Sequence, residues 1–384
     1  MKSIYLDHSA TTPVDKRVAD VVRDCMLDNF GNPSSIHSFG REARDVKENA
    51  RKIIADMINS SPEEIYFTSG GTEADNLALL GYVRKYDDRG KHIIVSSIEH
   101  PAVLRTAMEL DEELGFNVTY VEPDEFGTIH PGAIAEAITD GTILISIMHV
   151  NNEVGTINDV VAIGKIAREK GIAFHTDAVQ SFGKIPIDVE AMNIDMLSLS
   201  SHKIYGPKGV GAIYIRKGIE LQTRVFGGKQ ESGVRSGTEN LPGIVGMGLA
   251  AQISGEIIDQ EARDIGNLRD ELSRLILDQL SNVKLNGHPT NRLPGNLSLT
   301  FYGVEGEALL LTLDLQGIGV STGSACSSGK SDASHVLTAI GLSDEDANST
   351  IRFTLGRSNN LEDIQQTAEI IINTVNRLRS MSGD

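Results

Sequence analysis

Several residue types are scarce in this chain, and each shortage excludes a class of protein. There is no tryptophan, and Cys25 and Cys326 are the only cysteines among 384 residues. Two cysteines in so long a chain make neither a disulfide framework nor a metal cluster. No apolar run approaches the roughly 20 residues that span a bilayer, and residues 1–5 resemble no secretory signal. We therefore expect a cytoplasmic protein with no metal and no membrane partner.

Basic residues are also in the minority. Lysine and arginine number 35 against 53 aspartate and glutamate residues, which gives a formal net charge of −18. Such an acidic chain argues against nucleic acid as a partner, because a phosphate backbone is bound by a basic surface. The apolar fraction of 40% is ordinary for a globular enzyme, and the length predicts two domains.

Short apolar runs alternate with amphipathic segments between about residues 60 and 216. This alternation predicts an α/β fold with a largely parallel, helix-covered sheet. The expected strands are 64–68, 92–96, 118–122, 142–150, 172–176, 195–200 and 211–215, and the expected helices are 72–86, 100–114, 132–138 and 160–170. After residue 250 the pattern predicts a smaller α+β domain, with helices over 257–280, 305–315 and 361–380 and a strand over 296–302.

Lys203 stands directly after the apolar run 195–199, in the segment Ser-Ser-His-Lys-Ile-Tyr-Gly-Pro-Lys-Gly that spans residues 200–209. A lysine at the end of a buried strand can direct its amine into the molecule. Burial or a neighbouring cation lowers an amine's pKa from about 10.4 toward neutrality, as a carbonyl-trapping lysine requires. Taken alone, such a lysine more often ends a strand and extends its amine to water.

An acid at the end of a second predicted strand favours a reactive role for Lys203. The segment His-Thr-Asp-Ala-Val-Gln, residues 175–180, ends an apolar strand on Asp177. Acids at the carboxyl ends of strands lie where open α/β sheets bind ligands. Strand–Asp–strand–Lys is the order that a pyridoxal-phosphate site requires, since Lys203 condenses with the aldehyde and Asp177 keeps the pyridine nitrogen protonated. The alternative for Asp177 is a helix N-cap.

These two segments together resemble the cysteine desulfurases, a branch of the class V aminotransferase superfamily. The resemblance extends from residues 5–7 to residues 377–379 and implies a PLP-transferase fold with pyridoxal 5'-phosphate as cofactor. It implies a large cofactor domain over residues 14–258, and a small domain made of 1–13 and 259–384 that carries the catalytic cysteine loop.

The resemblance also assigns roles to polar residues at strand ends. The turn 67–73 contains Gly71 and Thr72, which would hold the cofactor phosphate together with Ser200 and His202; its alternative is an ordinary capping box. Thr238 would reach the phosphate from the other subunit, which implies a homodimer. His100 would lie on the pyridine ring and move protons, although a lone histidine there more often begins a helix. Asn152 and Gln180 would bond the cofactor or the substrate, although an Asn pair also suits a turn.

Cys326 lies in a segment of small residues, Ser-Thr-Gly-Ser-Ala-Cys-Ser-Ser-Gly-Lys over 321–330. With few packing neighbours and Lys330 close by, it suits a nucleophilic thiolate rather than a structural cysteine. Cys25 repeats at helical spacing with Val18, Val21 and Val22 and is a core residue. Arg352, in an alternating strand-like segment, would bind the substrate carboxylate in the family; its alternative is a structural ion pair.

The reaction that the resemblance implies converts L-cysteine to L-alanine. Cys326 takes the sulfur as a persulfide and donates it to a sulfur-acceptor scaffold protein of iron–sulfur cluster assembly. Two enzyme alternatives are another class V aminotransferase and a selenocysteine lyase, and a third is a catalytically silent scaffold. Lys203, Asp177 and Cys326 argue against the scaffold, and Cys326 against an aminotransferase.

Overall fold

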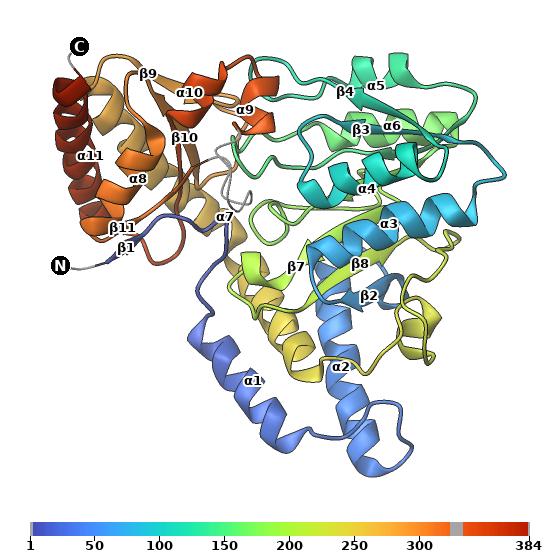
Figure 1. Cartoon of the computed structure of the whole chain (residues 1–384). Helices are drawn as coiled ribbons and strands as arrows, with labels where there is room; N and C mark the ends of the chain where they lie inside the picture. Colours follow the sequence, from blue (N-terminus) through green and yellow to red (C-terminus); the bar gives the residue numbers. More distant parts are fainter. Residues whose placement is uncertain (1–2, 323–332, 383–384) are drawn as a thin grey trace.

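Short strands and helices alternate over the first part of the chain, and the strands assemble into one sheet (Figure 1). The computed structural model describes residues 3–322 and 333–382. The sheet has the strand order β2-β8-β7-β6-β5-β3-β4. Its strands are β2 (Ile65–Thr68), β3 (His92–Ser96), β4 (Asn117–Val121), β5 (Thr142–Ser146), β6 (Ala173–Asp177), β7 (Met196–Ser200) and β8 (Gly211–Ile215). Only β8 runs antiparallel to its neighbours, β7 and β2. The expected α/β fold with a mostly parallel sheet is confirmed.

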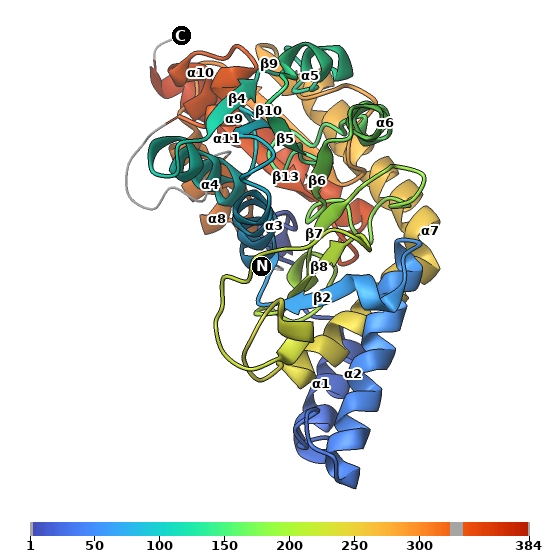
Figure 2. The same cartoon turned by 90° about the vertical axis from the view of Figure 1, so that its right-hand side faces the viewer.

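Helices cover both faces of this sheet (Figure 2). Successive strand residues enter opposite cores, since Ile93 packs with one hydrophobic cluster and Ile94 with the other. The first face is covered by α3 (Gly71–Lys85) and α4 (Pro101–Glu112). The second is covered by α2 (Ser38–Met57), α5 (Pro131–Ala137) and α6 (Val160–Lys170). Burial on both faces explains why the strands are continuous apolar runs.

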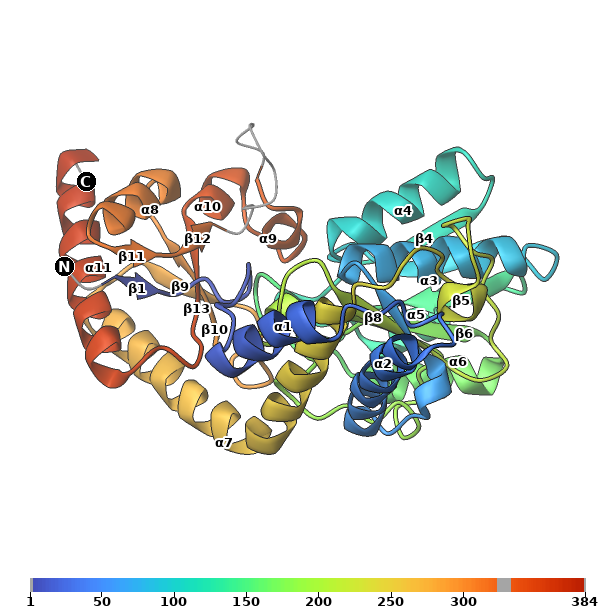
Figure 3. The same ribbon diagram turned by 90° about the horizontal axis from the view of Figure 1, so that it is seen from below.

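The long helix α7 (Leu241–Gln279) links the large sheet to the C-terminal part of the molecule (Figure 3). The sequence predicted its start at residue 257, which is wrong: Asn240 caps the helix by accepting a hydrogen bond from the Gly243 N–H, 3.2 Å away. Glycines in the N-terminal half of α7 hid the helical pattern in the sequence, and they allow α1 and α2 to pack closely against this helix. A Cβ on Gly248 would lie 2.7 Å from the Ala50 Cβ, and one on Gly246 2.6 Å from Val22.

Within the described residues, α7 is the one helix long and apolar enough to cross a membrane. Its most apolar window has a mean hydropathy of 1.4, but 56% of that window is buried inside the protein. It packs against α1 (Lys16–Asp28) and α2 at its N-terminal half. We therefore interpret α7 as a core helix.

The C-terminal part forms a second, smaller layer of helices on strands. One small sheet has the order β12-β13-β10-β9, and β1 (Ile4–Tyr5) pairs in parallel with β11 (Ile318–Gly319) in another. The remaining elements are β9 (Val283–Asn286), β10 (Asn296–Phe301), α8 (Gly306–Leu315), β12 (Ser321–Thr322), α9 (His335–Ala339), α10 (Asp344–Asn348), β13 (Thr350–Thr354) and α11 (Leu361–Ser382). Ile4 and Leu6 share a hydrophobic core with Leu272, Leu299 and Phe353. The exact division at residues 13/14 and 258/259 stays a proposal.

A buried ion pair fixes the loop that precedes α7 to the sheet. The Arg51 guanidinium donates to both carboxylate oxygens of Glu231, at 2.8 and 2.9 Å. Glu231 also accepts a hydrogen bond from the Phe67 N–H at 2.8 Å. The Glu231 side chain is only 2% exposed, whereas Glu48, which also pairs with Arg51, is 48% exposed. The buried partner therefore carries most of the interaction.

We predict that Glu231→Gln lowers the free energy of unfolding by about 3–5 kcal/mol, because it removes the buried partner of the Arg51 charge and leaves only the half-exposed Glu48. Glu48→Gln removes an exposed partner of the same arginine and serves as the control, with an expected loss of about 1 kcal/mol or less. Urea titration measures both. Equal losses in the two variants would contradict the assignment.

Candidate functional site

Lys203 lies where β7 leaves the sheet. The strand ends at Ser200, and a short 3-10 turn, η2 (Ser201–Lys203), carries the lysine over the carboxyl edge. Its Nζ donates hydrogen bonds to the carbonyl oxygens of Ser9, at 2.5 Å, and Ala10, at 2.7 Å. The amine thus points toward the N-terminal segment and not along the surface to water.

Asp177 occupies the equivalent position on the neighbouring strand. It is the last residue of β6 and pairs in register with Ser198 of β7. Its side chain is 6% exposed and accepts a hydrogen bond from the Val179 N–H at 2.8 Å. No helix begins there among the described residues, since β7 is the next element. The N-cap interpretation of Asp177 is therefore wrong, and its carboxylate lies at the strand edge.

Two basic side chains oppose the effect of burial on Asp177. Burial raises the pKa of its carboxyl, while His100 and Lys203 lower it. His100 caps α4: its Nδ1 accepts a hydrogen bond from the Ala102 N–H at 3.1 Å. Burial in turn lowers the pKa of the imidazole, with Asp177 raising it and Lys203 lowering it further. The structure thus brings Lys203, Asp177 and His100 into one electrostatic group.

The first turn of α3 forms a cradle with the end of β7. Its N-cap, Gly70, provides no side-chain cap, so N–H groups of the first turn are available to an anion. A Cβ on Gly71 would lie 2.6 Å from the Val179 Cγ2 and 3.8 Å from the Ser200 Cβ, so the turn needs glycine there. The Ser200 hydroxyl is buried and has no hydrogen-bond partner within residues 3–322 and 333–382. The exposed Thr72 follows Gly71 directly.

His202 lies in η2, directly before Lys203, and its imidazole is neutral. Burial and the nearby charges of Lys203 and Lys208 lower its pKa to about 4. Its Nδ1 lies 3.1 Å from the Thr11 hydroxyl. Thr238 lies exposed on the loop before α7, which the Arg235–Glu73 ion pair, 2.8 Å long, holds beside α3.

Arg352 lies at the domain junction on β13 and is 4% exposed. It pairs with Asp7 at 2.8 Å and donates to the carbonyl oxygen of Asn152 at 3.0 Å. The structural ion pair that the sequence left open as the alternative role of Arg352 is therefore present. In the part of the chain that the structure describes, however, its buried Nε has no hydrogen-bond partner, so a donor remains for a substrate carboxylate. Asn152 is brought to the same place by this contact.

Gln180 holds the N-terminal segment next to Lys203. Its Nε2 donates to the carbonyl oxygen of Ser9 at 3.0 Å, and its Oε1 accepts from Lys184 at 3.4 Å. Ser9 therefore accepts hydrogen bonds from both Gln180 and Lys203. Sequence reasoning missed Ser9 and Ala10, because contacts between backbone carbonyls and a distant lysine leave no pattern in the residue types.

Cys326 lies outside the described residues, but the segments on either side of it reach the site. On the N-terminal side, Ser321 of β12 pairs with Arg352 of β13. On the C-terminal side, the Ser334 hydroxyl donates to the Glu153 carboxylate at 2.5 Å, and His335 lies 3.1 Å from the Glu99 carbonyl oxygen.

Two buried acids near Asp177 were also missed. Glu99 accepts hydrogen bonds from the Ser96 hydroxyl and the Met148 N–H, and burial raises its pKa to about 8. Asp75 lies 3.7 Å from His175, and burial together with the Asp177 charge raises its pKa well above the ordinary value. Burial therefore favours the neutral form of both acids. His175 was visible in the motif, but its partner on α3 was not.

The residues present fit pyridoxal phosphate. The unpartnered Ser200 hydroxyl and the glycine turn at α3 suit its phosphate, and Asp177 suits its pyridine nitrogen. Lys203 is placed to bind its aldehyde. This fold and this site define an enzyme of the pyridoxal-phosphate-dependent transferase class.

Comparison with known proteins narrows the class. Residues 4–367 match the family "Aminotransferase class-V". The chain is 49% identical over 381 residues to a cysteine desulfurase IscS of Methanosarcina thermophila, covering 99% of this chain and 94% of that protein. A solved NifS-like protein superposes with a TM-score of 0.92 at 36% identity, covering 98% and 100% of the two chains. Another, described as SspA in complex with cysteine, gives 0.80 at 39% identity over 92% and 99%. This chain therefore belongs to the class-V aminotransferase family and, within it, to the cysteine desulfurases.

We predict that Ser200→Ala weakens pyridoxal phosphate binding by about tenfold or more, because a hydrogen bond to a charged group is lost. The cofactor-free protein should keep its stability, since the hydroxyl has no partner among the described residues. Ser201→Ala is the control and should keep the affinity. The buried Ser201 hydroxyl faces Gly206, where an added Cβ would lie 2.1 Å from it, and not the cradle. Fluorescence titration measures the affinities. An unchanged affinity in Ser200→Ala would contradict the cradle.

Proposed function

We propose that this enzyme converts L-cysteine to L-alanine and retains the sulfur on Cys326 as a persulfide. The observation that carries the proposal is the placement of Lys203 and Asp177 at adjacent strand ends. Arg352 lies across the domain junction, on a strand whose neighbour leads into the Cys326 segment. Bound pyridoxal phosphate supplies an electron sink for the bonds at the substrate's α-carbon.

The protein's own groups perform the remaining tasks. The free Nε of Arg352 binds the substrate carboxylate, and Asn152, whose carbonyl Arg352 holds, lies beside it. The Lys203 amine takes the α-proton and later returns it. Asp177 is the acid at the cofactor nitrogen, and His100 and Lys203 favour its ionised form against the effect of burial. His100 is placed to stack on the ring and to move protons.

Sulfur transfer proceeds by nucleophilic attack. The Cys326 thiolate attacks the substrate sulfur, so an S–S bond forms while the substrate's C–S bond breaks and its electron pair stays with the carbon fragment. Protonation of that fragment gives alanine. The terminal persulfide sulfur then passes to a thiol of an acceptor protein, which regenerates the Cys326 thiolate. A sulfur-acceptor scaffold of iron–sulfur cluster assembly is the proposed recipient, in the cytoplasm, where thiols stay reduced.

We also propose that the active form is a homodimer. The tip of the α1–α2 hairpin projects from the body of the molecule (Figures 1 and 2). It exposes large apolar side chains, with exposed fractions of 61% for Met26, 67% for Leu27, 70% for Phe30 and 88% for Ile36. A second copy would cover this patch, and its Thr238 would reach the phosphate cradle.

Sedimentation equilibrium should give the mass of two chains, and a monomer at micromolar concentration would refute the proposal.

We predict that Cys326→Ser lowers sulfide release from cysteine and a thiol reductant by about 100-fold or more, because the attacking thiolate is gone. The cofactor absorbance should be retained, since Lys203 is untouched. Cys25→Ala is the matched control, because Cys25 is 3% exposed in the core, and it should stay active. Full activity of Cys326→Ser would instead favour an aminotransferase.

A further inference from the structure

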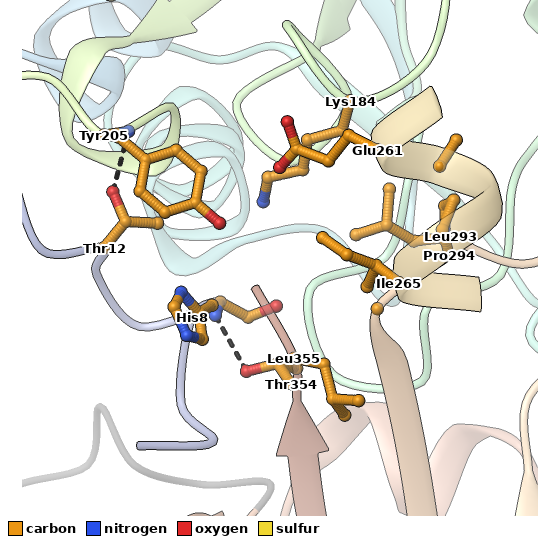
Figure 4. A pocket seen from close by; sticks show the side chains of 13 residues that line it. His8, Thr12, Lys184, Tyr205, Glu261, Ile265, Leu293, Pro294, Thr354 and Leu355 are labelled. Atoms are coloured by element: carbon orange, nitrogen blue, oxygen red, sulfur yellow. Dashed lines mark hydrogen bonds between the residues drawn. The ribbon is translucent and has the colours of Figure 1, made fainter. Parts of the chain in front are cut away.

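A pocket that the proposed reaction does not use lies between the two domains, behind the N-terminal segment (Figure 4). It comprises about 440 Å³ of space between protein atoms, part of it open to solvent. The large domain contributes Lys184 and Tyr205, and the other side contributes Glu261, Ile265 and Leu293. Its walls are mainly apolar and carry a few polar groups, which is the lining typical of small-molecule sites.

The Lys184 amine is the uncompensated charge of this pocket. Figure 4 shows its side chain reaching into the space below Glu261. Its Nζ makes a long hydrogen bond, 3.4 Å, to Gln180, and it is paired with no carboxylate within residues 3–322 and 333–382. Glu261 is already engaged by Arg357, at 2.8 Å. Burial and the charge of Lys203 lower the pKa of Lys184 to about 7. An anion would restore its charged form.

A second polar group in the wall has one nitrogen without a partner. His8 is 3% exposed, and its Nδ1 has no hydrogen-bond partner among the described residues, whereas its Nε2 lies 3.5 Å from the Ser358 hydroxyl. The bare backbone at Gly356 leaves it room, since a Cβ there would lie 2.3 Å from this nitrogen and 2.5 Å from the Tyr205 hydroxyl. Burial and the charge of Lys184 lower the pKa of His8 to about 4, so the imidazole is neutral and can still donate one hydrogen bond.

The opposite wall is apolar. Ile265 and Leu293 face Lys184 across the pocket together with Pro294 and Leu355 (Figure 4). Among the described residues, the pocket thus offers a cation without a carboxylate partner, an imidazole nitrogen without a hydrogen-bond partner and an aliphatic wall. These features are complementary to a molecule with a single negative end and an apolar body.

We propose that this pocket binds a small monocarboxylate with an apolar body, its carboxylate on Lys184 and its body against Ile265, Leu293 and Leu355. This site goes beyond the proposed desulfurase activity and does not depend on it. Its wall includes Ser9, whose carbonyl oxygen accepts the hydrogen bonds of Lys203 and Gln180. A bound carboxylate therefore contacts the same segment that positions the reactive amine.

The test is calorimetric titration of the holoenzyme with 3-phenylpropionate. We expect saturable binding to the unaltered protein, and binding weaker by about tenfold or more in Lys184→Met, which keeps the side-chain length and removes the charge. The neutral analogue 3-phenylpropanamide should bind as weakly to the unaltered protein. Arg352→Lys should keep its affinity, because Arg352 belongs to the substrate site.

Two outcomes would overturn the proposal. The first is no saturable binding to the unaltered holoenzyme. The second is binding that survives Lys184→Met and is lost in Arg352→Lys, which would place the carboxylate in the substrate site. If Lys184→Met does not fold by circular dichroism, Leu293→Trp replaces it and should abolish binding by filling the pocket. Sulfide release, measured on the same preparations, reports separately on the desulfurase proposal.

Discussion

The parallel hydrogen bonding between β6 and β7 is the constraint on which the site depends. It sets Asp177 opposite Ser198, two residues before the strand ends, so that the acid and the turn that carries Lys203 share one sheet edge. A slip of one residue would move the Asp177 side chain to the other face. The antiparallel strand β8 pairs Gly211 with Ser200 and returns the chain after the turn. The N-terminal segment completes the arrangement, since the Thr12 hydroxyl donates to the His202 carbonyl at 3.0 Å.

Burial then makes Asp177 electrostatically distinct from its acidic neighbours. Asp75, Glu99 and Asp177 are all almost fully buried, and burial raises the pKa of each. Of the three, only Asp177 has basic side chains, His100 and Lys203, that lower its pKa against this effect. The ionised form is therefore favoured more at the strand end than at the other two acids, and a protonated pyridine nitrogen would be stabilised there.

The strands, and Asp177 and Lys203 at their ends, could be predicted because each is marked by residues that are neighbours in the sequence. Continuous apolar runs mark buried parallel strands, and an acid or a lysine at the end of such a run marks the edge. The first half of α7 was missed because its glycines lower helix propensity, and their purpose is contact with Ala50, about 200 residues away in the sequence. Other contacts also join segments that are distant in the sequence, namely Lys203 with Ser9, Arg352 with Asp7 and Arg51 with Glu231. The periodicity of the sequence does not indicate such contacts.

The central claim is that Lys203 is the amine that binds the cofactor aldehyde. Lys184 is the natural competitor, because it lies nearby and its pKa is lowered to about 7. The most direct measurement is borohydride treatment of the holoenzyme followed by peptide mass spectrometry. The account predicts that the pyridoxyl mass increment lies on the peptide containing Lys203 and that Lys184 stays unmodified. An increment on Lys184, or none on either lysine, would contradict it.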